Sequence, residues 1–229
     1  RHFEIAEDNE KAIDYLCLAG ERAVKLLSNE EAVAHYRHGL ELLKSLPDLP
    51  EKMDRELKLQ GSIGVPLLAL RGFSDPELAE AYGRAREICQ QIGSAPQLFP
   101  LLGGLKSYYD LRGQIYTALD LGKQMMSIAE QQGDENLLIM ANNTLGVTVL
   151  YTGDLNGYRQ HLNKVIQLYD FNRHRSLAFK FGYDPKVATF AHATGLWMMG
   201  YPDEALQKAR EAVELADAIG HPFTQGFAY

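Results

Sequence analysis

Apolar residues recur along residues 203–219 at a spacing that predicts one amphipathic helix. They follow one another at intervals of four, three, four and three residues, at Ala205, Ala209, Ala212, Ala216 and Ile219. Polar and charged residues fill the other positions, so this helix is expected to bury one stripe and expose the rest. Gly200 and Pro202 precede the helix and Gly220 follows it, as ordinary helix start and stop signals.

Residues 135–151 have two apolar stripes instead of one. The first stripe is Leu138, Ala141, Leu145 and Val149, and the second is Leu137, Met140, Thr144, Val147 and Tyr151. A helix with two apolar faces has to be packed between neighbours, because a single contact cannot bury both stripes. Strand-like alternation bounded by turn residues is not found in the sequence, so the pattern predicts an all-α protein.

Helix–turn–helix units recur with a period near 40 residues. Their turns contain Gly72, Gly113, Gly153 and Gly200, which are separated by 41, 40 and 47 residues. A first unit uses Ser28 and Asn29 as its turn, and two second helices end at Gly93 and Gly133, 40 residues apart. Two helices per unit at this period are typical of an α-solenoid. We therefore expect about five helical hairpins, with residues 221–229 opening a sixth helix.

We expect a single superhelical domain over residues 1–229, cut from a longer protein, since the chain starts with Arg and stops inside a helical pattern. The predicted repeats cover residues 10–47, 51–93, 96–133, 135–170 and 185–220, and a lengthened connection covers 171–184. Asp184 and Pro185 are the expected N-cap and first residue of the helix after this connection.

The composition is that of an ordinary globular protein, with 46% hydrophobic and 23% charged residues. A net charge of −7 repels polyphosphates and anionic membranes, so we expect this chain to bind neither nucleic acid nor membrane. No apolar run approaches the roughly 18 residues of a membrane span, and no signal peptide is present, so a cytoplasmic location is expected. Cys17 and Cys89 are expected to be buried free thiols.

Residues 170–185, DFNRHRSLAFKFGYDP, combine basic and aromatic side chains in an acidic chain. The basic or titratable residues are Arg173, His174, Arg175 and Lys180, and the aromatic residues are Phe171, Phe179, Phe181 and Tyr183. The basic residues are too few for a nucleic-acid site, and the aromatic residues are expected to pin the connection over a neighbouring repeat, with a short helical turn through SLAFKF. Two interpretations stay open: a packed structural insertion, or an insertion that borders a binding pocket at His174 and Arg175.

Tyr108, Tyr109 and Arg112 fall within about one turn of a predicted first helix. First helices line the concave face in this architecture, so these residues, together with Asn142, are candidates for a groove that binds a partner. The alternative is packing between repeats, with tyrosine hydroxyls bonded at the rim. Packing is also expected for Trp197 and for the two methionines that follow it.

No constellation in the sequence supports catalysis, and we expect no enzyme activity, cofactor or metal. The nearest imitation of a phosphate loop, GGLKS at residues 103–107, lacks the GxxxxGK[ST] spacing and falls within a helical pattern, where its glycines favour close packing. His35 and His38 have a spacing that can hold a metal on a helix, but a third ligand is not evident. An exposed polar face is the preferred interpretation of this pair.

TLGVTVLYTGD contains a Leu-Gly pair at Leu145 and Gly146, and EALQKAREAVELA has small residues at Ala205, Ala209 and Ala212. With these features the units resemble tetratricopeptide (TPR) repeats of the lengthened kind found in large bacterial signalling proteins. The Trp and the terminal Pro of the short consensus are not repeated in every unit.

Longer blocks add a second resemblance that covers nearly the whole chain. They include RGFSDPELAEAYGRAREICQQIG, HRSLAFKFGYDPKVA and MMGYPDEALQKAREAVELADAIGHPF, in this order. Together they resemble the helical region that follows the nucleotide-binding module in bacterial STAND-type ATPases, many of which have a class III adenylate/guanylate cyclase domain. Other members of that group have a DNA-binding domain instead.

The resemblance implies a non-catalytic sensor or protein-interaction module of such a signalling ATPase. Binding of a protein, a peptide, a small effector or the parent's own upstream domains would shift the population of repeat packings. Two alternatives stay open. One is a structural scaffold that self-associates and brings cyclase domains together, and the other is the sensor region of a STAND-type transcriptional regulator.

Overall fold

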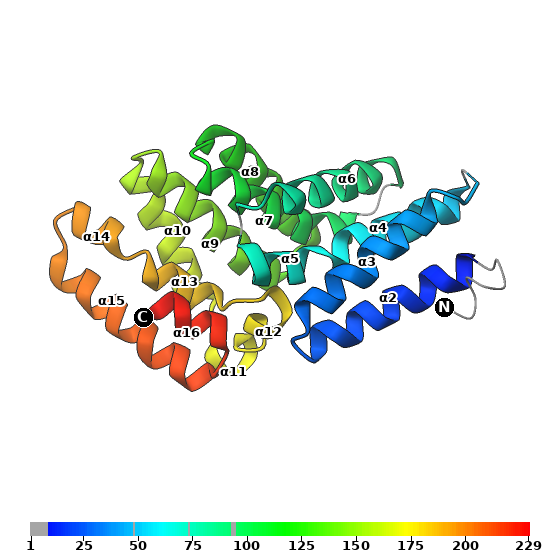
Figure 1. Ribbon diagram of the computed structural model, residues 1–229. Helices are drawn as coiled ribbons and strands as arrows, with labels where there is room; N and C mark the ends of the chain where they lie inside the picture. The colour runs from blue at the N-terminus through cyan, green and yellow to red at the C-terminus, as the bar shows by residue number, and fades with distance from the viewer. Residues whose placement is uncertain (1–8, 48, 73, 93–94) are drawn as a thin grey trace. The chain divides into compact units, whose positions relative to one another are not determined.

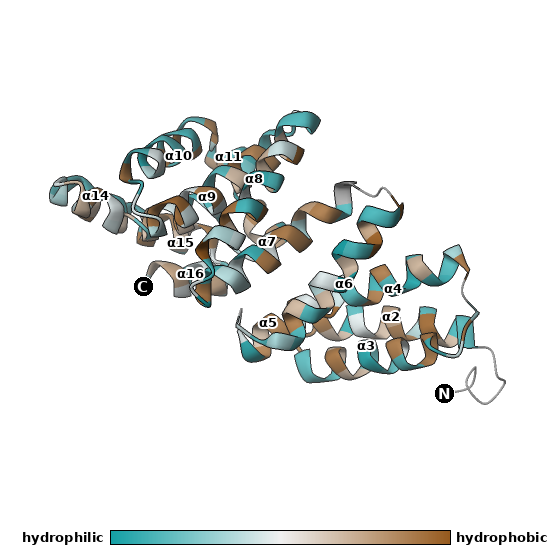
Figure 2. Cartoon of the chain, turned by 90° about the horizontal axis from the view of Figure 1, so that it is seen from above, coloured by the Kyte–Doolittle hydropathy of each residue, from teal (hydrophilic) through white to brown (hydrophobic). Residues whose placement is uncertain are grey.

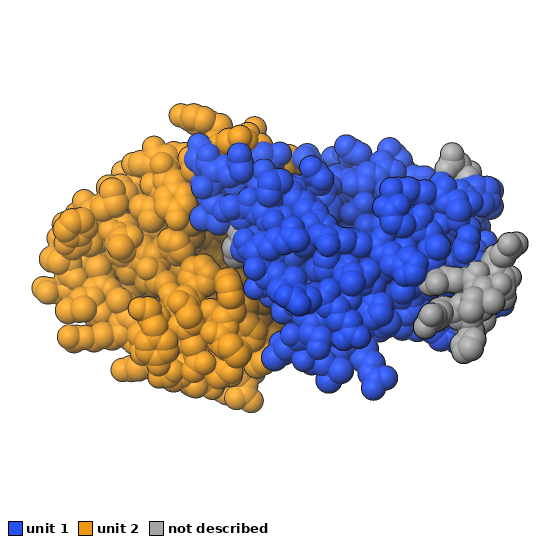
Figure 3. All heavy atoms as spheres, in the orientation of Figure 1, with its two compact units in different colours: residues 1–113 blue, residues 114–229 orange. Residues whose placement is uncertain are grey.

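The computed structural model describes residues 9–47, 49–72, 74–92 and 95–229. Within these ranges the regular elements are helices and no strand occurs, which confirms the all-α prediction (Figure 1). The chain divides into two compact units, residues 1–113 (unit 1) and 114–229 (unit 2), shown in Figure 3. No described helix is both long enough and apolar enough to cross a membrane.

Unit 1 is built from α2 (Asn9–Lys25), α3 (Asn29–Leu43), α4 (Pro50–Ser62), α5 (Gly64–Arg71), α6 (Pro76–Ile92) and α7 (Ala95–Leu111). α2 packs on α3 and α6 packs on α7, so helices that follow each other in the chain pair in space. Figure 2 shows hydrophobic and hydrophilic residues alternating along α2 and α3, as expected for helices that bury one stripe. Cys17 and Cys89 are buried and free, as predicted.

Unit 2 is built from α8 (Ile115–Gln132), α9 (Glu135–Tyr151), α10 (Leu155–Leu168), α11 (Phe171–His174), α12 (Leu177–Phe181), α13 (Pro185–Ala191), α14 (Thr194–Met198), α15 (Pro202–Ile219) and α16 (Pro222–Ala228). α9 packs against α8, α10 and α13. Residues of both predicted stripes are buried: Ala141 and Leu145 of the first, and Leu137, Met140 and Thr144 of the second. The prediction of a helix packed between neighbours is therefore confirmed.

The predicted turn glycines all adopt the left-handed backbone region that favours glycine. Their φ angles are 77° at Gly72, 71° at Gly113, 82° at Gly153 and 88° at Gly200. In the first unit the left-handed residue is Leu27, with φ of 59°, directly before the predicted Ser28–Asn29 turn. Gly93 lies outside the described residues, and the single domain and the repeat bounds stay predictions.

Aspartate side chains begin four helices of unit 2. Asp134, Asp154, Asp170 and Asp184 accept hydrogen bonds from backbone N–H groups in the first turns of α9, α10, α11 and α13. Each carboxylate satisfies donors that a helix start otherwise leaves unpaired. Pro185 is the first residue of α13, so the predicted N-cap and proline start are confirmed.

Gly104 and Gly195 are among the glycines that let a tyrosine ring approach a helix backbone. A Cβ on Gly104 would overlap the Tyr82 ring, which agrees with the close packing predicted for GGLKS. A Cβ on Gly195 would lie 2.7 Å from Cδ1 and 2.9 Å from Cζ of Tyr158. Both contacts need a residue without a side chain.

Two burial predictions from the sequence are wrong. Ala209 is exposed, because α13, α14 and α16 cover α15 on the face that contains Ala205, Ala212 and Ala216. Packing is also predicted for Trp197 and Met198, but Trp197 is 64% exposed and Met198 is 58% exposed, so neither is a core residue. α14 is only five residues long and packs through Gly195 and Leu196, so its last residues point outward.

Candidate functional site

Three aromatic rings lie at the ends of three neighbouring helices in unit 2. Tyr151 is the last residue of α9, His192 directly follows α13, and Phe227 lies in the last turn of α16. α13 packs against both α9 and α16, and the three helices are adjacent in Figure 1. Residues far apart in the sequence are therefore brought to one place.

The ring centroids of Tyr151 and His192 are 6.5 Å apart, and those of His192 and Phe227 are 6.0 Å apart. Phe223 packs edge-on against Phe227 at 5.6 Å, and Tyr183 stacks on Phe227 at 6.0 Å. These five residues are named the ring row. Tyr151 is 49% exposed and Phe223 is 43% exposed, so the row reaches solvent. Aromatic side chains of this kind are enriched at recognition surfaces.

An interruption between α13 and α14 positions the central ring of the row. His192 has φ of −90° and ψ of 19°, in the bridge region, and the helix resumes only at Thr194. The His192 carbonyl oxygen accepts hydrogen bonds from the Gly195 N–H at 3.2 Å and from the Tyr158 hydroxyl at 2.8 Å. The backbone at His192 is thus held by a side chain from α10.

Tyr158 is buried against Gly195, and burial raises the pKa of its hydroxyl to about 12. The hydroxyl therefore stays protonated at neutral pH and keeps donating to His192. The ring of His192 is also oriented, because its Nδ1 lies 2.8 Å from the Ala188 carbonyl oxygen. A carbonyl oxygen only accepts, so Nδ1 carries the proton of this contact.

Acidic residues outnumber basic residues in unit 2. Asp154 follows Tyr151 by three residues, and Asp217 of α15 accepts a hydrogen bond of 2.7 Å from the Tyr229 hydroxyl. α16, with the sequence PFTQGFA, contains no charged residue. Residues 114–229 contain nine Lys and Arg against twelve Asp and Glu. This excess of acidic residues in unit 2 favours a cationic partner over an anionic one.

The predicted connection at 171–184 contains the short helices α11 and α12, and α12 confirms the helical turn expected through SLAFKF. Phe171 and Phe181 pack on a buried cluster that includes Tyr169 and Leu177. The Phe179 ring lies 5.1 Å from His221, before α16, in an edge-to-face contact. The prediction that these aromatic residues pin the connection onto neighbouring helices is confirmed.

His174 is only 2% exposed and ties the connection to α9. Its Nδ1 accepts a hydrogen bond of 2.8 Å from the Asp170 N–H, and its Nε2 lies 3.8 Å from a carboxylate oxygen of Glu135. Arg173 pairs with the same carboxylate. Arg175 is exposed, with its guanidinium 5.6 Å from the centroid of the Phe171 ring. The burial of His174 favours the packed insertion over the pocket.

Asp184 links three elements through hydrogen bonds. Its Oδ2 accepts from the Tyr169 hydroxyl at 2.6 Å, and its Oδ1 accepts from the N–H groups of Lys186 and Val187 at 2.9 Å each. Its own N–H donates to the Thr224 hydroxyl of α16 at 3.0 Å. Burial raises the pKa of this carboxyl, and the hydrogen bonds oppose that rise.

Tyr108, Tyr109 and Arg112 lie together at the C-terminal end of α7 in unit 1. The two rings are 5.3 Å apart, edge to face, and the Arg112 guanidinium is 5.4 Å from the Tyr108 centroid. Their role in a groove stays a prediction.

Lys106 of GGLKS, on the same helix, is buried 2.7 Å from the Asp110 carboxylate, and burial lowers the pKa of its ammonium. No pattern in the sequence predicts this buried ion pair.

Asn142 is buried in unit 2 and joins α9 to α10. Its Nδ2 donates to the Leu138 carbonyl at 2.8 Å, and its Oδ1 lies 3.0 Å from Nδ1 of His161. Burial lowers the pKa of His161. Its neighbour Asn143 donates to the Thr189 hydroxyl of α13 at 2.8 Å. Asn142 therefore takes part in helix packing, and a role in partner binding stays a prediction.

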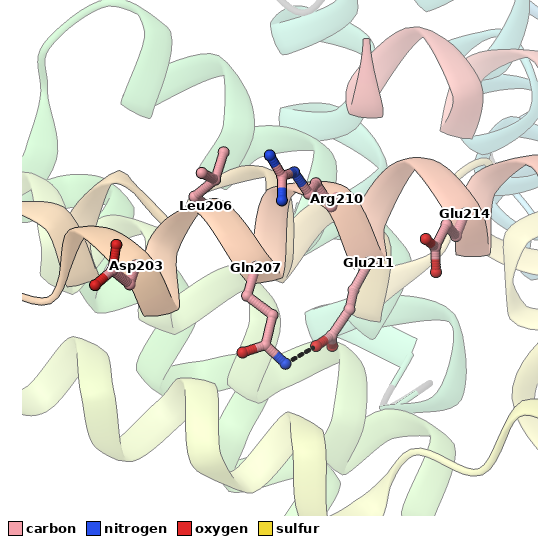
Figure 4. A pocket seen from close by; sticks show the side chains of 6 residues that line it. All are labelled: Asp203, Leu206, Gln207, Arg210, Glu211 and Glu214. Atoms are coloured by element: carbon pink, nitrogen blue, oxygen red, sulfur yellow. Dashed lines mark hydrogen bonds between the residues drawn. The ribbon is translucent and has the colours of Figure 1, made fainter.

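A hollow on α15 is lined by Asp203, Leu206, Gln207, Arg210, Glu211 and Glu214 (Figure 4). Its lining is mostly polar, and Gln207 donates to Glu211 at 2.9 Å across it. Small-molecule sites are mostly apolar, so the ring row is the stronger candidate.

Among the residues that the structure describes, no three His, Cys, Asp or Glu side chains gather to hold a metal. His35 of the predicted His35–His38 pair lies 3.6 Å from Glu31.

No protein-family model and no curated protein sequence matches this chain. Solved structures do match it. The apo form of RapI has a TM-score of 0.72 at 14% identity, over 90% of this chain and 70% of that chain. The Rap conjugation gene regulator of plasmid pLS20, in complex with the Phr* peptide, has a TM-score of 0.67 at 15% identity, over 94% of this chain and 56% of that chain.

A Rap protein complexed with Competence and Sporulation Factor has a TM-score of 0.66 at 13% identity, over 96% of this chain and 59% of that chain. The kinesin light chain TPR-like repeats of Podosopora anserina have a TM-score of 0.61 at 14% identity, over 89% of this chain and 94% of that chain. At identities of 13–15%, the similarity to these structures shows a common fold and nothing more. The chain is an all-α, TPR-like solenoid, as predicted.

Proposed function

We propose that this chain is a non-catalytic recognition module that binds a protein or peptide segment on the ring row. The supporting observation is the meeting of five aromatic residues from α9, the connection, the end of α13 and α16 on one surface. Rings held in place by neighbouring helices offer large contact area at a small cost in conformational entropy.

The comparisons support a peptide or protein as the partner class. Two of the similar structures are described with a partner, the Phr* peptide in one and Competence and Sporulation Factor in the other. The three Rap chains are longer, and this chain spans 56–70% of their lengths. The partners of those proteins support only the class of ligand, a peptide or a protein.

The connection provides a route by which binding is relayed. Tyr183 stacks on Phe227 within the ring row and lies directly before Asp184. The same connection pairs with α9 through Glu135 and with α16 through Thr224. A partner that displaces Tyr183 therefore favours one packing of these helices over another, which is the differential affinity that a population shift requires.

We further propose that the parent protein is a bacterial signalling ATPase linked to a class III cyclase domain. This part rests on the resemblance of the sequence blocks to the helical region of STAND-type ATPases. A STAND-type transcriptional regulator is the alternative parent. The experiment is to add a peptide that binds the ring row to the full-length parent and to measure ATP turnover and cyclic nucleotide formation. A change in either rate tests the relay of binding to the other domains, and the activities themselves test which domains the parent has.

Peptide binding is tested by selecting a phage-displayed random peptide library on the immobilised chain. Selected peptides are then titrated against the wild type, Tyr151→Ser and Phe223→Ser by fluorescence anisotropy. Tyr116→Ser is the matched control, because Tyr116 is 80% exposed on α8 and lies outside the ring row. We expect affinity to fall at least about tenfold in the two ring-row variants and to stay unchanged in the control. Unchanged binding in the ring-row variants would contradict the proposal.

An exposed apolar group favours a scaffold as the second candidate function. Trp197, Met198 and Tyr201 are exposed around the turn between α14 and α15. Contiguous exposed apolar patches mark protein association surfaces. Light scattering of the wild type and of Trp197→Ser over a concentration series tests this function, which requires a dimer that the substitution weakens. If the wild-type chain stays monomeric at every concentration measured, the scaffold function is refuted.

A further inference from the structure

A histidine side chain caps the start of α16. The Thr224 N–H donates to Nδ1 of His221 at 3.3 Å, and the same nitrogen lies 3.1 Å from the Thr224 hydroxyl oxygen. That hydroxyl is buried and accepts the Asp184 N–H at 3.0 Å, so its own proton is left to donate to Nδ1. A ring nitrogen that accepts hydrogen bonds has no proton, so His221 caps α16 only when its ring is neutral, with the proton on Nε2.

This cap lies where several elements of unit 2 meet. α16 packs against α13 and α15, and its Ala228 packs on a buried hydrophobic cluster. Asp184 is the N-cap of α13, so its bond to Thr224 joins the starts of α13 and α16. The His221 ring meets the Phe179 ring of α12 edge to face, with 5.1 Å between the centroids. His221 and Thr224 therefore hold the start of α16 against two neighbouring elements.

Protonation of His221 removes the acceptor on which the cap depends. An imidazolium ring has an N–H at both nitrogens and accepts no hydrogen bond. Its Nδ1–H would point at the Thr224 N–H, which is also a donor, and could bond only the Thr224 hydroxyl oxygen. The proton of that buried hydroxyl would then lose its acceptor, and a buried polar group without a partner is costly. Burial also disfavours the charged ring and lowers the pKa of His221 from 6.5.

The titratable groups on the elements around α16 have other contacts. Asp217 of α15 accepts hydrogen bonds from two side chains of residues 225–229, at 3.2 Å and 2.7 Å. At the two ends of α13, the Asp184 carboxylate accepts from three donors, and Nδ1 of His192 contacts the Ala188 carbonyl oxygen. The ammonium groups of Lys180 and Lys186 lie over aromatic rings. The response of the cap to pH is therefore assigned to the His221 ring itself.

We propose that His221 is a pH-sensitive latch, which holds α16 on unit 2 while its ring is neutral and releases the helix when its ring is protonated. The latch does not depend on whether the ring row binds a peptide. Phe223 and Phe227 belong to α16, so its release would also take two of the five rings out of the row.

Hydrogen exchange read by mass spectrometry tests the latch on the wild-type chain. Exchange is measured at about pH 7.5 and about pH 5 and converted to protection factors, which removes the intrinsic effect of pH on the exchange rate. We expect the protection of α16, relative to that of α15, to fall at least about threefold at the lower pH. His161→Gln is a control, because it removes a second histidine whose pKa is lowered by burial and should leave the fall unchanged.

Two substitutions separate the latch from a general loss of stability in acid. Asparagine is a preferred N-cap and does not titrate, so His221→Asn should protect α16 equally at both pH values. His221→Ala has no capping group and should leave α16 weakly protected at both. Equal protection of wild-type α16 at the two pH values, a fall of the same size in His221→Asn, or full protection in His221→Ala overturns the proposal.

A titration followed by nuclear magnetic resonance tests the same assignment without any variant. The His221 ring and the Thr224 amide should titrate together, with a midpoint below the ordinary histidine value of 6.5. Two different midpoints, or a common midpoint at or above 6.5, would show that protonation of His221 does not disrupt the cap.

Discussion

Replacing Gly195 by alanine tests whether the contact between α10 and α14 fixes the break at His192. Alanine in a helix is ordinarily better than glycine by roughly 0.5–1 kcal/mol. At this position the added Cβ would lie 2.7 Å from Cδ1 of the buried Tyr158 ring, too close for either group to remain in place. The substitution therefore sets helix propensity against packing.

The cost of the steric overlap should exceed the gain in helix propensity. Forcing an extra methyl group into a filled core costs about 1–3 kcal/mol. A displaced Tyr158 ring also loses its 2.8 Å hydrogen bond to the His192 carbonyl, worth about 0.5–1.5 kcal/mol. After the gain in propensity is subtracted, we expect Gly195→Ala to lower the free energy of unfolding by about 2 kcal/mol.

Gly226→Ala is the matched control, because Gly226 lies in α16 and a Cβ there meets no atom within 4 Å. It should leave stability unchanged or raise it by up to about 1 kcal/mol. Urea denaturation followed by far-UV circular dichroism measures both variants. Equal stability of Gly195→Ala and Gly226→Ala would refute the reasoning. Combining Gly195→Ala with Tyr158→Leu should recover part of the loss, because the smaller side chain removes the overlap.

Four further predictions concern single side chains. Tyr158→Phe should lower the free energy of unfolding by about 0.5–1.5 kcal/mol in urea, because one buried hydrogen bond is lost; an unchanged value would contradict it. Burial lowers the pKa of His161 from 6.5, so the unfolded chain takes up its proton first and stability falls as the pH drops through 6.5. His161→Gln should lose less stability than the wild type between about pH 7 and pH 5, and an equal loss in both contradicts the assignment. Burial raises the pKa of Asp184 above 3.8, so the folded state binds this proton first and its contribution to stability is lost as the pH rises through the folded pKa. The stability of the wild type relative to Asp184→Asn should therefore increase as the pH falls from neutral toward about 4, and the opposite trend speaks against it. Burial raises the thiol pKa of Cys17 and Cys89, so both should react with a thiol reagent only after urea unfolding, and a fast phase in the native chain would show that one is accessible.

The helices and turns could be predicted because their signals are local. The glycines at 72, 113, 153 and 200 sit where the backbone is left-handed, and Asp184 with Pro185 marks the start of α13. These residues act on their own or on neighbouring backbone groups, so the sequence alone contains the information.

The ring row could not be predicted because its members lie far apart in the sequence. Tyr151, His192 and Phe227 are separated by 41 and 35 residues, and only the packing of α13 between α9 and α16 joins them. At the break between α13 and α14, the His192 carbonyl accepts its hydrogen bond from the hydroxyl of Tyr158, 34 residues earlier. Likewise, the burial of Lys106 beside Asp110 depends on what covers α7, which an amphipathic pattern does not state.

The exposed position of Trp197 makes the protein its own fluorescent reporter. It is the only tryptophan among the 229 residues and lies five positions after His192, on the short α14. Selective excitation therefore yields emission from a single site in unit 2, close in sequence to the central ring of the row. Emission wavelength and quenching by iodide or acrylamide can follow rearrangement of the α13–α14 break without any label, and unit 1, which has no tryptophan, adds no background.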